Sequence, residues 1–549
     1  MGEAETDERG RDGRLRTGSH GRRRRPAAVA VLVAIAVLVA LASGGSAPTP
    51  AAAAGAYDAY GGWSATTLPA TGFFRTAQVN GRWWLVTPDG HPFFSNGLNH
   101  VTPIGTVDKN GHAAYHDAII TKYGSESAWA AAQVVRFGTW GVNSLGGWSD
   151  VGLFDGRGVP YTITLSLSGQ NSGTGRMADF WSPGWVSSVQ SSTASAAAGR
   201  ANDPWLLGYF LDNELHWTKD WRPTEQLDFY LQRGAAEPGK VHLVDWLKTR
   251  YANDFTAFAA DFTTDATDWA SLPSATTIAD AGGSGARPTR DAWAGEVAER
   301  FFSVAHAALK AADPHHLDLG SRLVAQVITP EVLQAAAAHV DVVSINWYEI
   351  LPQLEEYVAG LGPDFMPTAD TLAAHGKLSS KPLMITEFGW RAMDSGLPNT
   401  WPPLQVVVDT QQDRATRYRN FGQCLVNTGY VVGAHWFEMT DEPAIGRFDG
   451  ENDNWGMVTE ADDEYPLVAA SAAAVHDMAY APLANPSWSP GACTPQGPQL
   501  ATTTTTTTAA PTTTTSTTAS SSTTAAGVAP ATASAGTGTS TAVTPAFTG

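Results

Sequence analysis

The segment Lys381–Trp390 reads KPLMITEFGW and combines two patterns that seldom occur together. Its first half, Pro382–Thr386, is an apolar run with the length and composition of a buried strand. The run then closes on a carboxylate, Glu387, which Phe, Gly and Trp follow. Buried strands that end on polar and aromatic residues are typical of a parallel α/β sheet, where the carboxyl ends of the strands carry the functional side chains.

Seven further runs of this kind occur, and helical stretches separate most of them. In chain order the eight runs lie in Phe93–Asn99, Trp140–Asp150, Tyr161–Gly169, Trp205–Trp217, His316–Val324, Val340–Glu349, Lys381–Trp390 and Tyr430–Pro443. Strands that alternate with helices indicate βα units and a parallel sheet. Eight units predict an α/β fold of the (β/α)8 TIM barrel type. A doubly wound open sheet is the alternative, but no glycine-rich phosphate loop follows the first run.

The regions around the runs also have regular patterns. Turn signals at Asn80-Gly81 and Pro88-Asp89-Gly90 divide the segment before the first run, which predicts an antiparallel hairpin there. Apolar residues recur every three or four positions in four longer stretches, which predicts helices. These stretches are residues 241–262, 292–314, 329–339 and 409–427.

The two ends of the chain differ from its middle. Residues 1–54 contain a basic region, an apolar run at Ala27–Ala42 and an Ala-rich exit, an order typical of a secretory signal peptide or an N-terminal anchor. The apolar run is shorter than the roughly 20 residues that span a bilayer. Residues 501–549 are Thr, Ala and Ser with little else, so we expect a disordered tail. These features predict one catalytic domain at 57–489 in a secreted or cell-surface protein, with possible cell-wall or membrane association through the termini.

Charge and cysteine content narrow the choice of partner. The 549 residues carry a net charge of −19, which disfavours binding to nucleic acid and to anionic lipid and suits a neutral polysaccharide. Cys424 and Cys493 are the two cysteines, too few for a disulfide scaffold. The Cys and His residues have no spacing typical of a metal site, and we expect neither metal nor cofactor.

Two carboxylates are the candidates for chemistry. Glu214 closes the fourth run and Glu387 the seventh, so in an eight-stranded barrel they face each other across the mouth. Cleavage of a glycosidic bond generally needs two carboxyl groups, about 5–5.5 Å apart for retention of configuration and about 6.5–9.5 Å apart for inversion. Taken singly, a Glu at a strand end is more often a solvated or ion-paired residue. The pair at strands four and seven favours catalysis.

Polar and aromatic residues at the other strand ends predict a carbohydrate-binding cleft. The apolar faces of sugar rings stack on aromatic side chains, and their hydroxyl groups bond Asn, His and Arg. The candidates for substrate binding are Asn99, His100, Asn143, Trp148, Asn213, Arg322, Trp347, Tyr348, Trp390 and Trp436, with Trp217 as a further aromatic. The alternative for several of the tryptophans is simple packing under the βα loops.

Several of these motifs resemble a known family. DNE in the fourth run, NWY in the sixth, TEFGW in the seventh and HWF in the eighth resemble the clan A retaining glycoside hydrolases. The blocks GRWWLVTPDGHPFFSNGLNHV, LGYFLDNELHW, HLDLGSRL and WFEMTDEPAIGRFDGENDNWGMV are similar to the β-agarase-type enzymes of glycoside hydrolase family 50. The similarity extends over about Gly72–Val468.

The resemblance implies a role for several residues. It implies Glu214 as the general acid/base, Glu387 as the nucleophile, Asn213 as a sugar-binding residue and Tyr348 as a hydrogen-bond donor to the nucleophile. It also implies that four residues line the sugar-binding cleft, namely Asn99, His100, Arg322 and Trp436. The expected enzyme is an exported, retaining, agarase-like glycoside hydrolase that cleaves β-glycosidic bonds of a poly- or oligosaccharide.

One feature departs from the family pattern. Agarases of that family usually carry a β-sandwich domain before the barrel, whereas only a short segment separates the apolar region from the first block here. Agarose, a β-galactoside and another β-linked polysaccharide therefore all remain candidate substrates. The alternatives to an enzyme are a carbohydrate-binding barrel without catalysis and a cell-surface adhesion protein.

Overall fold

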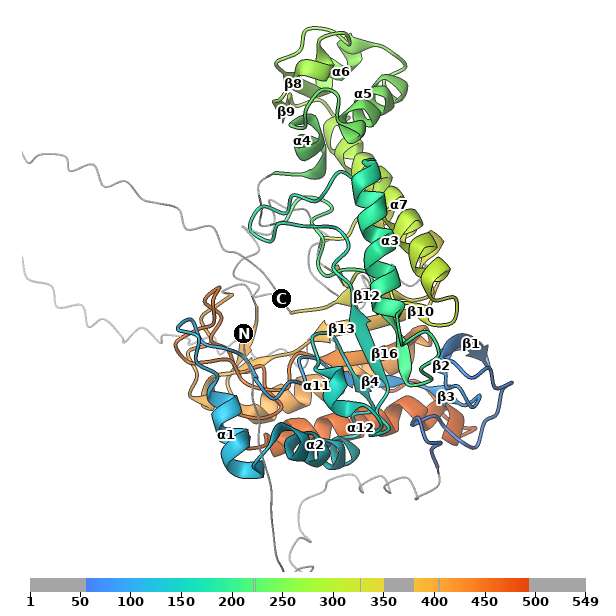
Figure 1. Cartoon of the computed structure of the whole chain (residues 1–549), viewed down its shortest axis with the longest axis vertical. Coiled ribbons are helices and arrows are strands. Elements are labelled where there is room, and N and C mark those ends of the chain that lie inside the picture. The colour runs from blue at the N-terminus through green and yellow to red at the C-terminus, as the bar shows by residue number, and fades with distance from the viewer. Residues whose placement is uncertain are drawn as a thin grey trace, which may run out of the picture. The chain divides into compact units, whose positions relative to one another are not determined.

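The computed structural model describes residues 56–220, 222, 224–325, 327–349, 380–402 and 405–492 (Figure 1). The predicted signal or anchor region at 1–54 and the Thr-rich tail at 501–549 lie outside the described residues, as does Cys493. Cys424 is buried.

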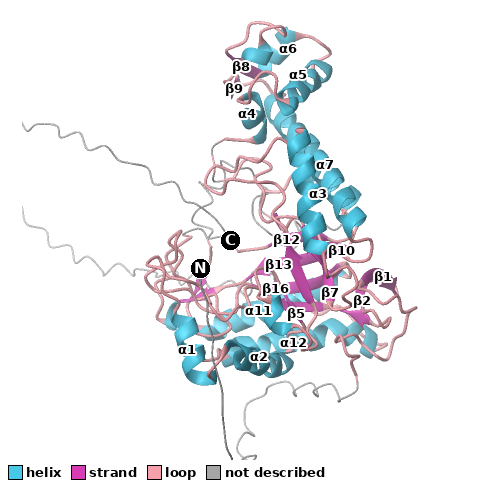
Figure 2. Cartoon of the chain, viewed as in Figure 1, coloured by secondary structure: helices cyan, strands magenta, loops and turns pink. Residues whose placement is uncertain are grey.

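A nine-stranded parallel sheet forms the centre of the fold, in the order β10-β7-β6-β5-β4-β16-β13-β12-β11 (Figure 2). Its strands are β4 (Ser95–Leu98), β5 (Ser144–Leu145), β6 (Tyr161–Thr164), β7 (Leu206–Phe210), β10 (Leu317–Asp318), β11 (Leu323–Val324), β12 (Val343–Asn346), β13 (Leu383–Phe388) and β16 (Val431–Trp436). Each of the eight predicted runs contains a strand of this sheet. The α/β class and the parallel sheet are therefore confirmed.

The predicted fifth strand is divided into β10 and β11. Gly320 and Arg322 between the two parts have φ values of 75° and 50°, which an extended strand does not allow. β10 pairs with β7 at one edge of the sheet and β11 pairs with β12 at the other. The two edges of the sheet thus come from one short segment, so the sheet curls round on itself.

Helices follow most of the strands. They are α1 (Ala114–Tyr123), α2 (Glu126–Trp140), α3 (Pro183–Ala197), α4 (Gln226–Leu231), α5 (Pro238–Arg250), α6 (Phe255–Asp261), α7 (Ala286–Ala312), α8 (Pro330–His339), α11 (Gln411–Thr428) and α12 (Pro466–Ala484). The side chains of Ser125, Ser182 and Thr410 cap α2, α3 and α11 by accepting a backbone N–H of the first turn. All four stretches with a helical period contain helices.

Helix α12 is long and apolar enough to pass a length-and-composition test for a membrane span. Its Val475 side chain meets Gly422 of α11, where an added Cβ would come within 2.3 Å of a Val475 methyl group. The Ser471 hydroxyl also donates to the Ala415 carbonyl of α11 at 2.9 Å. These contacts explain the apolar character of α12 as packing against α11 in the core.

The segment between β7 and β10 contains α4, α5, α6, the N-terminal half of α7 and a small hairpin of β8 (Phe262–Thr264) and β9 (Ile278–Asp280). Trp293 of α7 is fully buried there. Its ring stacks on Trp181 with a centroid distance of 5.5 Å and meets Tyr230 edge-on at 5.3 Å. This insertion therefore has a core of its own, continuous with the helices around the sheet.

The predicted hairpin covers the amino-terminal end of the sheet. β1 (Arg75–Val79), β2 (Arg82–Val86) and β3 (Pro92–Phe93) are antiparallel, which confirms the prediction. Leu85 and Phe93 of the hairpin join one apolar cluster with residues at the starts of sheet strands, namely Leu207, Leu317, Met384 and Val432. Because this cluster closes the amino ends, the carboxyl ends of the strands are left for the functional loops.

Candidate active site

Left-handed backbone conformations gather where the strands end. Five non-glycine residues with positive φ follow the first five strand runs or interrupt them: His100, Trp148, Ser166, Glu214 and Arg322, with φ between 47° and 58°. Such conformations cost on the order of 1–3 kcal/mol each and concentrate at functional sites. Four of the five are predicted site residues.

Glu387 lies near the end of β13 and its side chain is buried. Its Oε2 accepts a hydrogen bond from the Tyr348 hydroxyl at 2.7 Å, and its Oε1 lies 3.1 Å from Nη2 of Arg322. Burial raises the pKa of Glu387, whereas the Arg322 charge and the Tyr348 hydrogen bond act in the opposite direction. The positive charge beside one oxygen and the hydroxyl that donates to the other both stabilise the ionised carboxylate.

A β-bulge turns Glu387 toward this group. Along β12 and β13, Ile345 pairs with Ile385 but Asn346 pairs with Glu387, so Thr386 is an extra residue. The Thr386 hydroxyl donates to Asn346 Oδ1 at 2.8 Å, while its carbonyl accepts from Arg322 at 2.8 Å. Bulges at strand ends commonly re-aim a side chain in this way.

Arg322 is held on several sides. Nη2 also donates to Oδ1 of Asn99 at 3.1 Å, and the guanidinium lies over the Trp148 ring at 4.1 Å from its centroid. The side chain is fully buried. A buried guanidinium with this many partners is fixed in position, so its charge stays directed at Glu387.

Glu214 follows β7 and is only partly buried. Its Oε1 accepts from the Asn346 amide at 2.9 Å. Because Asn346 Oδ1 already accepts from Thr386, the NH2 group must be the one that faces Glu214. Burial and, next, the negative charge of Glu387 raise the pKa of Glu214 to about 7.

The two carboxyl groups are therefore in unequal environments. Glu387 has a cation beside one oxygen and a hydroxyl donor on the other, whereas Glu214 accepts a hydrogen bond from a neutral amide. One negative charge is thus favoured at Glu387, and the proton is favoured at Glu214. A protonated acid beside an ionised carboxylate is the pairing that a general acid and a nucleophile require.

Several predicted residues lie in this group and leave some surface open to solvent. His100, Trp148, Asn213 and Tyr348 are partly exposed, as is Glu214. Asn213 Oδ1 lies 3.4 Å from the Asn346 amide, and His100 Nδ1 bonds the Glu438 carboxylate. Asn99 is fully buried and bonds Thr386 O at 2.9 Å and the Gly147 N–H at 2.8 Å, so it joins the ends of strands and does not face solvent.

Three tryptophans do not line the opening. Trp347, Trp390 and Trp436 are 3%, 2% and 1% exposed. Trp436 stacks on Tyr418 of α11 with a centroid distance of 4.7 Å, and Trp347 and Trp390 contact Phe421 of the same helix. They point from the sheet toward α11, so the structure favours the packing alternative for all three. Trp217 is also buried, between Phe301 and Phe302 of α7.

Asn143 is likewise not brought to this group. It precedes β5, where its Oδ1 accepts from the Asn96 N–H and its Nδ2 donates to the Phe94 carbonyl, both at 2.9 Å. These partners lie at the start of β4, so Asn143 is at the amino end of the sheet. The structure therefore does not bring Asn143 to the carboxyl pair, and its contact with substrate stays an untested prediction.

Two residues of the group were not among the predicted site residues. Asn346 bonds Glu214 and Thr386, although its position at the end of the sixth strand run made it a candidate from the sequence. Trp455 lies against Tyr348 at a centroid distance of 5.5 Å. Trp455 comes from the long segment after β16, and the sequence contains no strand pattern that predicts where this segment lies.

The amino-acid sequence of the chain is similar to those of known proteins. No protein-family model matches the chain. It is 27% identical over 492 residues to β-agarase B of Vibrio sp. (strain JT0107), covering 75% of this chain and 49% of that protein. It is 30% identical over 465 residues to β-agarase A of the same strain, covering 73% of this chain and 45% of that protein. The chain is similar to β-agarases. It spans about half the length of these two curated relatives.

Solved structures agree with the sequence comparison. PfGH50B superposes with a TM-score of 0.66 at 26% identity, covering 77% of this chain and 68% of that one. The agarase AgWH50C superposes with a TM-score of 0.65 at 25% identity, covering 77% of this chain and 67% of that one. An exo-β-agarase shares the fold, with a TM-score of 0.65 at 24% identity, covering 78% of this chain and 67% of that one. The resemblance to agarase-type glycoside hydrolases predicted from the motifs is supported.

Proposed function

We propose that this chain is a retaining glycoside hydrolase that cleaves β-glycosidic bonds, with the curled sheet closing as a full (β/α)8 barrel. Glu387 is the nucleophile and Glu214 the general acid/base. The observation that carries the proposal is the unequal environment of the two carboxyl groups, with Arg322 and Tyr348 on Glu387 and the neutral Asn346 amide on Glu214.

The reaction is a double displacement. Glu387 attacks the anomeric carbon, and Glu214 delivers its proton to the leaving glycosidic oxygen as that bond breaks. A covalent glycosyl ester on Glu387 results. Glu214, now ionised, takes a proton from a water molecule, which attacks the anomeric carbon and returns the carboxylate of Glu387.

The substrate is a β-linked polysaccharide, and agarose is the first candidate because the relatives are β-agarases. The partly exposed Trp148 and Tyr348 supply aromatic surface beside the carboxyl pair, and Asn213 and His100 supply hydrogen-bonding groups. Export through the apolar segment at 27–42 would bring the enzyme to a polymer that does not enter cells.

A substrate panel tests the proposed function. Purified protein is incubated with agarose, other β-galactans, β-glucans and β-mannans, and new reducing ends are measured. We expect release from one class of β-linked polymer, with agarose the first to examine. Binding to a polymer without any release of reducing ends would instead support a carbohydrate-binding protein.

The pH dependence should follow the proton on Glu214. Because burial and the Glu387 charge raise the pKa of Glu214 to about 7, kcat/KM should fall as the pH rises through about 7 and the acid loses its proton. At low pH the rate should also fall as Glu387 becomes protonated. Initial rates between pH 4 and 10 with an oligosaccharide substrate measure the profile.

The Glu214→Gln variant is the control for this profile. Its remaining activity should lack the alkaline limb, because the amide does not titrate. An alkaline limb that stays unchanged in the variant would assign the ionisation to another group.

A further inference from the structure

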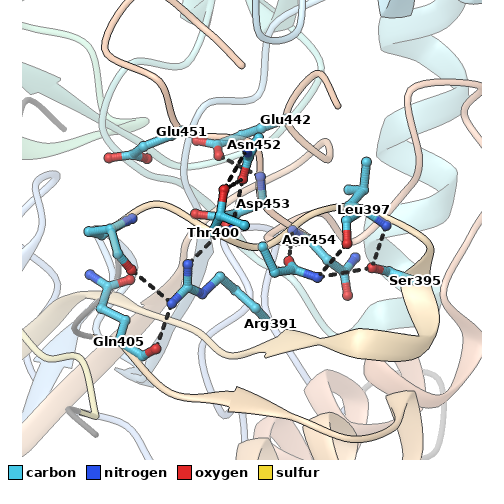
Figure 3. Close-up of polar contacts among 12 residues, drawn as sticks. Arg391, Ser395, Leu397, Thr400, Gln405, Glu442, Glu451, Asn452, Asp453 and Asn454 are labelled. Carbon is cyan, nitrogen blue, oxygen red and sulfur yellow. Dashed lines mark hydrogen bonds and ion pairs between the residues drawn. The ribbon is translucent and has the colours of Figure 1, made fainter. Parts of the chain in front are cut away.

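Three buried carboxylates lie together in the segment that follows β16. One carboxylate oxygen from each of Glu442, Glu451 and Asp453 lies within 4.8 Å of the others. Figure 3 shows the three side chains gathered at one end of a polar group, with Arg391 beyond Asp453. Glu442 and Asp453 are fully buried and Glu451 is 6% exposed, so this acidic cluster offers little surface to a sugar.

The cations around the acidic cluster do not balance it. Arg447 lies 3.2 Å from Glu442, 2.8 Å from Glu451 and 2.9 Å from Asp449, and Arg391 lies 2.9 Å from Asp453. Within the described residues, these ion pairs set two guanidinium groups against four carboxylates. Carboxylates therefore outnumber guanidinium groups among these ion pairs, and buried carboxylates are costly unless protons or a further cation balance them.

Two buried oxygens in the acidic cluster, Glu442 Oε1 and Asp453 Oδ2, have no hydrogen-bond donor among the described residues. Oδ1 of Asp453 accepts from Arg391 at 2.9 Å, but its buried Oδ2 has no hydrogen-bond partner among the residues that the structure describes. Buried carboxylate oxygens are normally paired or bind a metal ion. The unpartnered Oδ2 of Asp453 therefore favours a ligand that carries positive charge.

We propose that Glu442, Glu451 and Asp453 bind a divalent cation and that this cation is Ca²⁺. Calcium binds oxygen ligands at about 2.3–2.6 Å, so two ligands on opposite sides of the ion lie up to about 5 Å apart. Magnesium requires about 2.0–2.1 Å and a near-ideal octahedron in which it usually keeps several waters, so a buried site of protein carboxylates suits it less well. The cation holds the segment that leads to Trp455, which lies against Tyr348.

The test measures calcium binding by the whole folded chain, independent of any activity. Protein treated with a chelator is titrated with CaCl2 in a calorimeter and is unfolded by heat with and without CaCl2. We expect one bound Ca²⁺ per chain and a rise in Tm of about 2–4 °C at a calcium concentration a hundredfold above Kd. MgCl2 should give a smaller rise.

Variants locate the bound ion. Asp453→Asn should abolish the calcium-dependent rise in Tm. The matched control is Asp462→Asn, a buried carboxylate bonded by Arg136, Lys122 and Tyr123, which should lower Tm but keep the calcium-dependent rise. If Asp453→Asn does not fold, Glu451→Gln at the rim of the cluster serves the same purpose.

Two results would overturn the proposal. Wild-type protein that shows neither binding heat nor a change in Tm up to millimolar CaCl2 would mean that protons balance the acidic cluster. A calcium-dependent rise that persists in full in a folded Asp453→Asn or Glu451→Gln variant would mean that the ion binds elsewhere.

Discussion

Glu387→Gln should lower kcat by about 10⁴-fold or more on the best substrate, with a smaller change in KM. The amide cannot attack the anomeric carbon, so no glycosyl ester forms. The carbonyl oxygen of Gln can still accept from Tyr348, which retains part of the local structure. Initial rates over a range of substrate concentrations, compared with wild type, measure the loss.

A matched control separates catalysis from folding. Glu225→Gln removes a carboxylate that pairs with Arg287 in the insertion at 2.8 Å and that forms no hydrogen bond or ion pair with Glu214 or Glu387. This variant should keep its kcat, and both variants should show the far-UV circular dichroism of the wild type. A folded Glu387→Gln variant with more than a tenth of wild-type kcat would exclude Glu387 as the nucleophile.

Glu214→Gln should lower the rate by an amount that depends on the leaving group. With an oligosaccharide, whose leaving alkoxide needs a proton, we expect a loss of about 10²–10⁴-fold. With an aryl β-glycoside that has an acidic phenol, the first step needs little help. The second step still lacks its base, so the variant should release a burst of about one equivalent of phenol and then turn over slowly.

This pattern is specific to a residue that acts in both steps. The comparison uses rapid-mixing absorbance for the phenol and reducing-end assays for the oligosaccharide. An equal loss on both substrates without a burst would show that Glu214 binds or positions the sugar and does not transfer its proton.

The sequence predicted the parallel sheet and the position of the carboxyl pair well, because both depend on local patterns. Apolar runs that end in polar residues locate strand ends, and βα alternation brings those ends to one face. The division of the fifth strand was not predicted. It follows from the left-handed conformations of Gly320 and Arg322, and for Arg322 the sequence offers no such signal.

The direction of side chains was harder to predict than their position in the chain. Phe388 pairs with Trp436 across β13 and β16, and both contact Tyr418 of α11, although the neighbouring Glu387 faces the opposite way. A one-residue shift in register moves a side chain to the other face of the sheet, and the bulge at Thr386 is such a shift. Asn143 lies outside the group because it precedes β5, which begins at Ser144.

The configuration of the first product tests the central proposal most directly. Proton NMR spectra are recorded within the first minutes of hydrolysis of whichever β-linked substrate the panel identifies, before mutarotation mixes the anomers. A double displacement through Glu387 predicts that the β-anomer appears first and the α-anomer only later. If the α-anomer appears first, the enzyme inverts configuration, no glycosyl ester forms on Glu387, and the proposed mechanism is wrong.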